Sequence, residues 1–308
     1  QMKISTSQLY DSAITQMNRQ QSNVAEMQAK LASGKSLVKP SDDAEKATLI
    51  QRLNSAMQRQ NVYELSLNRA DSRLRMEETA LSSAQSMLQR IRELAIQGSN
   101  GGLSTADRTI IANEVSSLRD ALLSLANTED ESGNFIFAGT AVKTSAFSKD
   151  GDGVITYSGD QNQTYVDISE YRQVELNRAG DAVFRSVPRT NNDGDVSNID
   201  FFKVISDFAE ALESGNEVTL SQGLSEVSKL TDDMALSMAD VGSRMSTVDS
   251  QRDILADTKL RFQELLSNAE DLDYATAVTK LSAQMLSLEA AQASFAKISQ
   301  LNLFNYLR

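Results

Sequence analysis

The chain lacks the two side chains that most often carry polar chemistry in proteins. It contains no histidine and no cysteine, so the commonest general base, the commonest metal ligand and every thiolate or disulfide are missing. The remaining reactive groups are mainly its 42 aspartates and glutamates. These act as acids, bases or ligands for hard cations only where two or more of them converge. Closely spaced carboxylates are therefore the first candidates for a catalytic or metal-binding site.

Two pairs of adjacent aspartates are the first candidates, Asp42 with Asp43 and Asp232 with Asp233. Neighbouring residues on a helix do not face one another, so neither pair is placed to share a proton. We interpret the first pair as a helix N-terminus, where negative charge meets the positive end of the helix dipole. We expect the second pair on the solvated face of a long helix.

A possible calcium loop and a possible glycosylation triplet are equally weak. The DGDG stretch from Asp150 to Gly153 begins like a calcium-binding loop, but Gln161 occupies the twelfth position, where a bidentate glutamate belongs. We interpret this stretch as a turn. The triplet starting at Asn162 matches an N-glycosylation acceptor, without a secretory context to support it. The residues thus predict no catalytic site, no cofactor and no metal, although an enzyme using Asp, Glu or Tyr in the central region remains an alternative.

The charge balance argues against one class of partner. Lysine and arginine number 30 against 42 acidic residues, and the net charge of −12 opposes a nucleic-acid partner held by phosphate neutralisation. No apolar stretch is long enough to span a bilayer, and Met2 to Ser5 run into polar residues rather than a Sec-type signal. We expect no membrane insertion, and either a cytoplasmic location or a signal-independent export route.

Long helices with one apolar stripe are the elements that organise the chain. The clearest covers residues 219–268 and places an apolar side chain at alternating steps of three and four: Leu220, Leu224, Val227, Met234, Met238, Val241, Met245, Val248, Leu255, Phe262 and Leu266. This spacing is typical of a helix that packs lengthwise against other helices. We expect Thr219 and Gln222 to form a capping box at its start.

The same spacing predicts further helices in the first part of the chain. One covers residues 3–33, where Gly34 ends it. A second runs to Gly98, with Ser41 or Asp42 as its expected cap. The glycine-rich reversal at 98–102 then leads to a third helix, which predicts an antiparallel hairpin. We expect Ser104 and Asp107 to cap that third helix.

The region between Gly133 and Gly194 has a different character. It holds seven of the 14 glycines, and period-2 runs such as 165–168 and 173–176 alternate apolar and polar residues. Short strands separated by turns predict a small β-rich domain. A short amphipathic helix should follow from Phe201 to Leu212 and pack on the open side of the β region.

These elements predict a mainly α fold, a long antiparallel helical bundle or coiled-coil rod built from both chain ends, with a small inserted β-rich domain. We expect three parts. Residues 1–33 and 272–308 form a terminal coiled-coil domain that is disordered in the monomer. Residues 42–130 and 216–268 form the long helical bundle, and residues 131–215 form the β-rich domain with one short helix.

Both chain ends carry an apolar stripe on a surface that is poor in charge. Residues 1–33 have a net charge of +1 and residues 274–308 of +2, whereas a free surface helix usually carries more charged side chains. We therefore predict that the ends are buried against other subunits. The expected assembly interface consists of the stripe residues Tyr10, Ile14, Met17, Val24, Leu31, Tyr274, Val278, Leu281, Met285, Leu288, Phe295, Leu301, Phe304 and Leu307.

Short motifs in these ends resemble the flagellin superfamily. The sequence LASGK at 31–35, followed by PSDDA at 40–44, resembles the segment that joins the first two helices of that family. The sequence LDYATA at 272–277, with AAQA at 290–293, resembles its C-terminal helix. GNFIFAG at 133–139 and the stretch at 297–307 are more similar to the family of hook-filament junction proteins than to flagellins.

The resemblance implies a structural axial component of the bacterial flagellum that joins the hook to the flagellin filament by helical self-assembly through its terminal helices. It implies a ring or short helical segment of subunits, contacts with the other hook-associated junction protein and with flagellin, and an export chaperone. It also implies export to the cell exterior through the flagellar type III channel, and no enzymatic activity. Flagellin itself and a non-flagellar helical scaffold are the alternatives.

Overall fold

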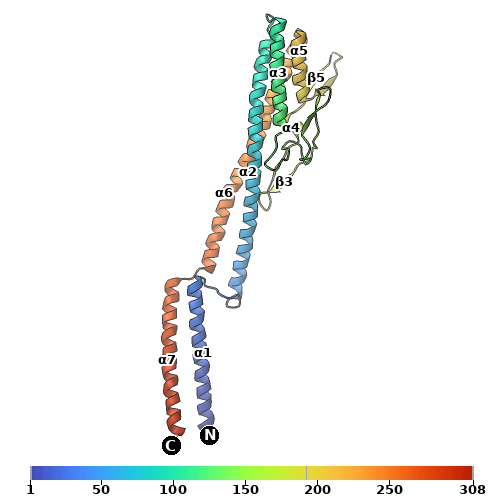
Figure 1. Ribbon diagram of the computed structural model, residues 1–308. Coiled ribbons are helices and arrows are strands. Elements are labelled where there is room, and N and C mark those ends of the chain that lie inside the picture. The colour runs from blue at the N-terminus through green and yellow to red at the C-terminus, as the bar shows by residue number, and fades with distance from the viewer. Residues whose placement is uncertain (1, 192, 307–308) are drawn as a thin grey trace. The chain divides into compact units, whose positions relative to one another are not determined.

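The computed structural model describes residues 2–191 and 193–306, with the side chains of residues 2–7, 298 and 301–306 outside the description. Its helices are α1 (Met2–Ser33), α2 (Ala44–Gly98), α3 (Thr105–Ala126), α4 (Gly180–Val183), α5 (Phe201–Ser214), α6 (Glu217–Glu270) and α7 (Tyr274–Tyr306) (Figure 1). Its strands are β1 (Phe147–Lys149), β2 (Ile155–Tyr157), β3 (Tyr165–Asp167), β4 (Gln173–Glu175), β5 (Val187–Thr190) and β6 (Val196–Ile199). The predicted mainly α class with a small β-rich insertion is confirmed.

The chain divides into two compact units. The first comprises residues 1–59 and 256–308, and the second comprises residues 60–255. The long helices α2 and α6 contribute residues to both units. The finer division into three domains stays a prediction.

In the first unit, α1 and α7 pack side by side (Figure 1). The two helices run antiparallel, and the end of α1 lies beside the start of α7. There the backbone nitrogen of Leu272, just before α7, donates a hydrogen bond of 3.0 Å to the carbonyl of Gly34. Gly34 has φ of 70°, the left-handed conformation that commonly ends a helix and that favours glycine. The glycine thus ends α1 as the sequence predicts.

The second unit has its main core where α2, α3, α5 and α6 meet the β-rich region. Leu81, Leu88, Val115, Phe208 and Val227 are among the fully buried residues of this core. A smaller cluster lies further along α2 and α6, where Leu67, Leu74 and Val248 pack against Ile168 and Val174 of the β3–β4 hairpin. The apolar stripes read from the sequence therefore face the interior.

Ion pairs fasten the long helices of this unit to one another. Arg90 of α2 lies 2.8 Å from Glu114 of α3, and Arg244 of α6 lies 2.8 Å from the buried Glu77 of α2. Ser104 and the side chain of Asp107 form the predicted capping box at the start of α3. The helical hairpin expected at the 98–102 reversal is present, with α3 beside α2 (Figure 1).

The β-rich region consists of three separate antiparallel hairpins, β1–β2, β3–β4 and β5–β6. The predicted runs 165–168 and 173–176 pair with each other, with Tyr165 opposite Glu175. Helix α5 packs mainly against α3 and also contacts the strands, so the expectation that it packs on the β region was incomplete. The reason is its apolar face, which is broad enough to reach α3 and also to place Phe202 against Phe147, with ring centroids 5.1 Å apart.

Two predicted helix caps were also wrong. Asp43, not Ser41 or Asp42, caps α2, because its Oδ1 accepts a 2.9 Å hydrogen bond from the backbone nitrogen of Lys46. At α6 the cap is Asn216, whose Oδ1 accepts from the nitrogen of Val218 at 3.0 Å. The expected cap residue Thr219 lies inside α6 instead. Several good capping residues stand together at both places, and their type alone does not select one.

Candidate assembly interface

The carboxylates that were candidates for chemistry have structural roles. Asp150 closes the turn predicted at 150–153, accepting hydrogen bonds at Oδ1 from the nitrogens of Asp152 and Val154. Asp233 is buried and paired with Lys229 at 2.5 Å, so the prediction that both aspartates of that pair lie on a solvated face was wrong for this one. The helix is packed on more of its circumference than one stripe implied. No group of three or more acidic side chains within residues 2–191 and 193–306 is placed to hold a metal ion.

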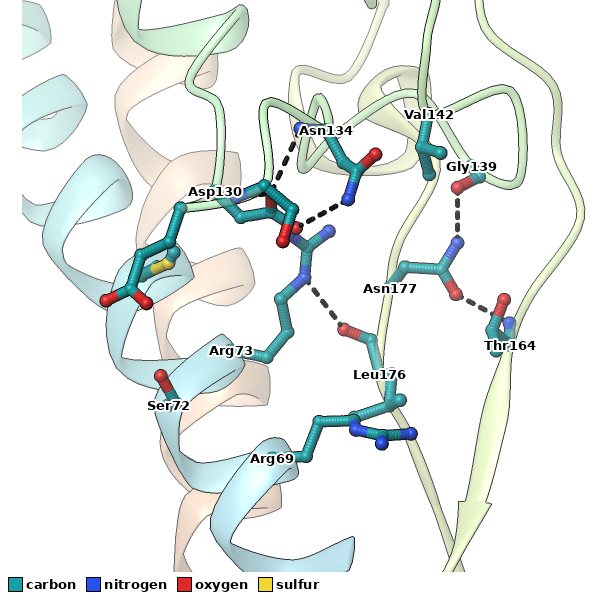
Figure 2. Close-up of a pocket in the computed structure, with 13 residues that line it drawn as sticks. Arg69, Ser72, Arg73, Asp130, Asn134, Gly139, Val142, Thr164, Leu176 and Asn177 are labelled. Carbon is teal, nitrogen blue, oxygen red and sulfur yellow. Dashed lines mark hydrogen bonds between the residues drawn. The ribbon is translucent and has the colours of Figure 1, made fainter.

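A pocket of about 400 Å³ lies between α2 and the loops that follow α3 (Figure 2). Arg73 enters it from α2 and donates to the carbonyl oxygens of Ile136 at 2.6 Å and Leu176 at 3.3 Å. On the opposite wall, Asn177 donates to the carbonyl of Gly139 at 2.6 Å and accepts from the nitrogen of Thr164 at 2.5 Å. Arg73 thus fastens the β-rich region to α2, and Asn177 joins two segments within that region.

Asp130 on the rim of the same pocket is also held by its own loop. Burial alone would raise the pKa of its carboxyl, but hydrogen bonds from Asn134 and the nitrogen of Ser132 outweigh this effect and lower the pKa. A carboxylate kept ionised in this way is a poor proton donor near neutral pH. Asp130 is therefore suited to holding its own loop rather than to donating a proton.

The surface that matters for the expected function is the α1–α7 pair. Val24 and Met27 of α1 and Ala277 of α7 are buried between the two helices. Further along the pair, the rings of Tyr10 and Phe295 contact each other with centroids 4.9 Å apart and planes inclined by 43°. The two ends of the chain thus supply each other with an apolar partner.

The predicted interface residues fall into two groups. Those packed in or beside the contact within the pair are buried or half-buried: Tyr10, Ile14, Met17, Val24, Leu31, Leu281, Leu288 and Phe295. Three residues of α7 remain open, Tyr274 with 55% of its surface exposed, Val278 with 51% and Met285 with 51%. The side chains of Leu301 and Phe304 lie outside the description, and Leu307 lies outside the described residues. The interface itself stays a prediction.

Sequence reasoning missed two exposed apolar side chains of this pair. Leu9 of α1 is 55% exposed and Leu286 of α7 is 69% exposed. Leu286 stands two residues before Leu288, which is almost opposite on a helix. Tracing a single stripe left such residues out, and counting all apolar positions around each helix would have found them.

A short pairing between two chain segments closes the base of the α1–α7 pair. This contact joins residues 34–36 to residues 269–272. The backbone nitrogen of Ser36 donates to the carbonyl of Glu270 at 2.7 Å, and Lys35 lies 3.2 Å from the carboxylate of Glu270. The Tyr274 hydroxyl donates to the carbonyl of Leu31 at 3.4 Å. Hydrogen bonds across the two segments fix the start of α7 against the end of α1.

Asp273 caps α7. Its side chain accepts hydrogen bonds from the hydroxyl of Thr276 at 2.7 Å and from the Thr276 nitrogen at 3.2 Å. These two bonds lower the pKa of the Asp273 carboxyl. None of the described helices combines the length and the apolar character needed to cross a membrane.

Comparison with known proteins agrees with this architecture. The family described as bacterial flagellin N-terminal helical region matches residues 4–142, and the bacterial flagellin C-terminal helical region matches residues 224–307. Flagellar hook-associated protein 3 of Escherichia coli is 26% identical over 98% of this chain and 99% of its own length. A flagellin of Clostridium tyrobutyricum is 30% identical, over only 42% of this chain and 34% of its own length.

The fold is similar to that of a solved structure as well. The structure of a putative flagellar hook-associated protein from Vibrio parahaemolyticus aligns with a TM-score of 0.66 and 21% identity, covering 75% of this chain and all of that one. The two flagellin regions match the helical parts at both ends of the chain, α1 to α3 and most of α6 with α7. The chain belongs to the flagellin superfamily.

Proposed function

We propose that the chain is a structural component of the bacterial flagellum that joins the hook to the flagellin filament. The observation that carries this proposal is the extent of the match to hook-associated protein 3, which covers nearly the whole of both chains. The flagellin match covers less than half of this chain, which makes a filament subunit the weaker alternative. A non-flagellar scaffold would leave the two flagellin regions unexplained.

We propose assembly through the terminal helices. The pair α1 and α7 leaves Tyr274, Val278 and Met285 exposed after each helix has covered the other. An apolar strip of this kind on a surface that is poor in charge favours packing against a second subunit. Contacts between unlike surfaces of identical subunits then generate a ring or a short helical segment.

The partners and the route follow from the same proposal. The neighbours would be the other hook-associated junction protein and flagellin, and an export chaperone would bind the C-terminal helix before assembly. Export would run through the flagellar type III channel as an unfolded chain. We propose that residues 1–33 and 272–308 are disordered in the monomer and fold on assembly. Residues 42–130 and 216–268 would form the long helical bundle, and residues 131–215 would form the β-rich domain that this bundle carries. No enzymatic step is needed for this role.

Deletion of the gene in its host tests the proposal. A junction role predicts intact hooks without filaments in electron micrographs, and flagellin released into the medium. Restoring the wild-type gene should return filaments and swimming, whereas an additional copy of the host's flagellin gene should not. Loss of the major filament protein itself would identify a flagellin, and normal filaments with normal swimming would contradict any flagellar role.

A further inference from the structure

The reversal between α2 and α3 contains the single Asn-Gly step of the chain, Asn100-Gly101. Both residues are exposed. The backbone of Asn100 is fixed at both sides, because its nitrogen donates to the carbonyl of Gln97 at 3.1 Å and its carbonyl accepts from the nitrogen of Leu103 at 3.3 Å. The part of the chain that the structure describes offers no hydrogen-bond partner to the Asn100 side-chain amide or to the Gly101 nitrogen.

The space around Gly101 is equally open. A Cβ atom added there would meet no atom within 4 Å, and its φ lies outside the left-handed region. The Gly101 nitrogen, two bonds along the backbone from the Asn100 Cα, therefore has open space beside its own Cα and no acceptor among the described residues. An asparagine amide facing such a nitrogen is set up for intramolecular attack, where proximity replaces a second reactant.

We propose that Asn100 is a site of spontaneous deamidation in the folded protein. The Gly101 nitrogen loses its proton and bonds to Cγ of Asn100, and the bond from Cγ to the side-chain nitrogen breaks, releasing ammonia and leaving a cyclic imide. Water then adds to either imide carbonyl, and opening of the ring gives aspartate or isoaspartate. The net change consumes one water and releases one ammonia, and nothing is oxidised or reduced.

The products alter the reversal in two ways. Each adds a negative charge shortly before the N-terminus of α3, where Ser104 and Asp107 already form a capping box and the helix dipole favours such a charge. The isoaspartyl product also routes the main chain through the former side chain. The carbonyl that accepts from Leu103 then becomes part of a free carboxylate, so the turn loses the hydrogen bond that closes it.

Mass spectrometry of the intact, full-length protein tests this site. The folded chain is incubated in mildly alkaline buffer and then digested with trypsin, which places Asn100 in the peptide 93–108 as its sole asparagine. We expect this peptide to gain the mass difference between an acid and an amide, with isoaspartate among the products. The rate should rise with hydroxide concentration, because the attacking nitrogen must lose its proton.

The chain supplies its own control in Asn216, which is also exposed but is followed by Glu217 and holds the start of α6 through its Oδ1. We expect Asn100 to convert several-fold faster than Asn216. Gly101→Ala should slow conversion of Asn100 several-fold while leaving the thermal transition unchanged, since the added methyl finds open space. Equal rates at the two asparagines, no effect of Gly101→Ala, or aspartate as the sole product would overturn the proposal.

Discussion

Asp160 shows how a single half-buried carboxylate can organise a loop. Its Oδ2 accepts from the Thr140 hydroxyl at 2.6 Å, and its Oδ1 accepts from the nitrogens of Thr140 and Asn162, both at 2.9 Å. Hydrogen bonds to the charged form favour ionisation. The Thr140 hydroxyl, together with these backbone donors, lowers the pKa of Asp160 from 3.8 to about 2.

This pKa predicts a specific loss of stability in acid. Because the folded pKa lies below the unfolded one, the carboxylate stabilises the fold above about pH 4, and that stabilisation is lost as the pH falls towards about 2. Asp160→Asn should therefore lower the free energy of unfolding at neutral pH, and its difference from wild type should shrink between these two pH values. Denaturant unfolding at several pH values measures this.

Asp152→Asn is the matched control for that experiment. It removes the same charge from an exposed turn, where the residue takes part through its backbone nitrogen. We expect Asp152→Asn to have only a small effect on the free energy of unfolding. A difference between Asp160→Asn and wild type that stays constant across this window would mean that the hydrogen bonds do not stabilise the charged form.

The roles of individual side chains as helix caps and buried groups were difficult to predict from the sequence. Asp43 and Asn216 cap their helices in place of neighbours of equal capping ability, because the choice depends on where the chain turns. Ser104 and Asp107 were predictable, since a glycine-rich reversal fixes the turn directly before them. Burial of Asp233 was not predictable, because the side chains that cover it come from the tertiary fold, although its ion-pair partner Lys229 lies one turn earlier on the same helix.

A charged cluster joins three elements of the second unit. Arg189 of β5 donates to both carboxylate oxygens of Glu226 in α6, at 2.7 and 2.6 Å, and to Asp207 in α5 at 2.6 Å. Glu226 is only 5% exposed. The two carboxylates raise the pKa of Arg189 by hydrogen bonding, which outweighs the opposite effect of burial. A buried carboxylate without its cation is costly.

Arg189→Met should therefore be one of the most destabilising single changes in this unit. We expect a loss of about 3 kcal/mol in the free energy of unfolding, the lower end of the range for removing one partner of a buried pair. Denaturant unfolding of the full chain measures it. The double variant Arg189→Met with Glu226→Met should recover much of the loss, because the buried charge is then gone as well.

The exposed pair Arg90 and Glu114 is the control for this prediction, since its side chains are 48% and 42% exposed. Arg90→Met should cost less than about 1 kcal/mol. If Arg189→Met were equally mild, or if the double variant were less stable than the single one, the cluster would not owe its effect to an unpaired buried charge.

The positions of the helices could be predicted from the sequence, but the neighbouring elements against which they pack could not. The spacing of Leu220, Val227, Met234 and Val241 fixes one face of α6, and each of these residues is buried. The strands β3 and β4 followed from alternating residues, whereas their pairing with each other was not predicted. The contact of α5 with α3 did not follow, because an apolar face shows that a helix packs but not on which neighbour.

At the scale of the whole molecule, the charge is concentrated away from the chain ends. The chain carries −12 in total, although residues 1–33 and 274–308 carry +1 and +2. Like charges on the remaining residues of identical subunits repel, while the ends add almost none of this repulsion. Packing of subunits through their ends is therefore the arrangement that the charge distribution favours.

Charged substitutions test whether subunits pack on the exposed strip of α7, which consists of Tyr274, Val278 and Met285. Val278→Asp with Met285→Asp places two carboxylates where we propose that a neighbouring subunit packs, and each buried side chain of this size is worth about 1.5–3 kcal/mol. Both residues are 51% exposed, so the change should leave the α1–α7 contact itself undisturbed and the helical content of the central bundle unchanged. We expect the variant to be exported but not to restore filaments in the deletion strain, as judged by electron microscopy and by immunoblots of the medium.

Leu286→Asp separates this interface from a general requirement for an apolar α7. Leu286 is 69% exposed and lies about 100° around the helix from Met285, outside the proposed strip. If subunits pack on the strip, Leu286→Asp restores filaments and the Val278 and Met285 variant does not. The reverse result would move the interface to the neighbouring face of α7, and full activity of both variants would mean that α7 makes no apolar contact between subunits along this stretch.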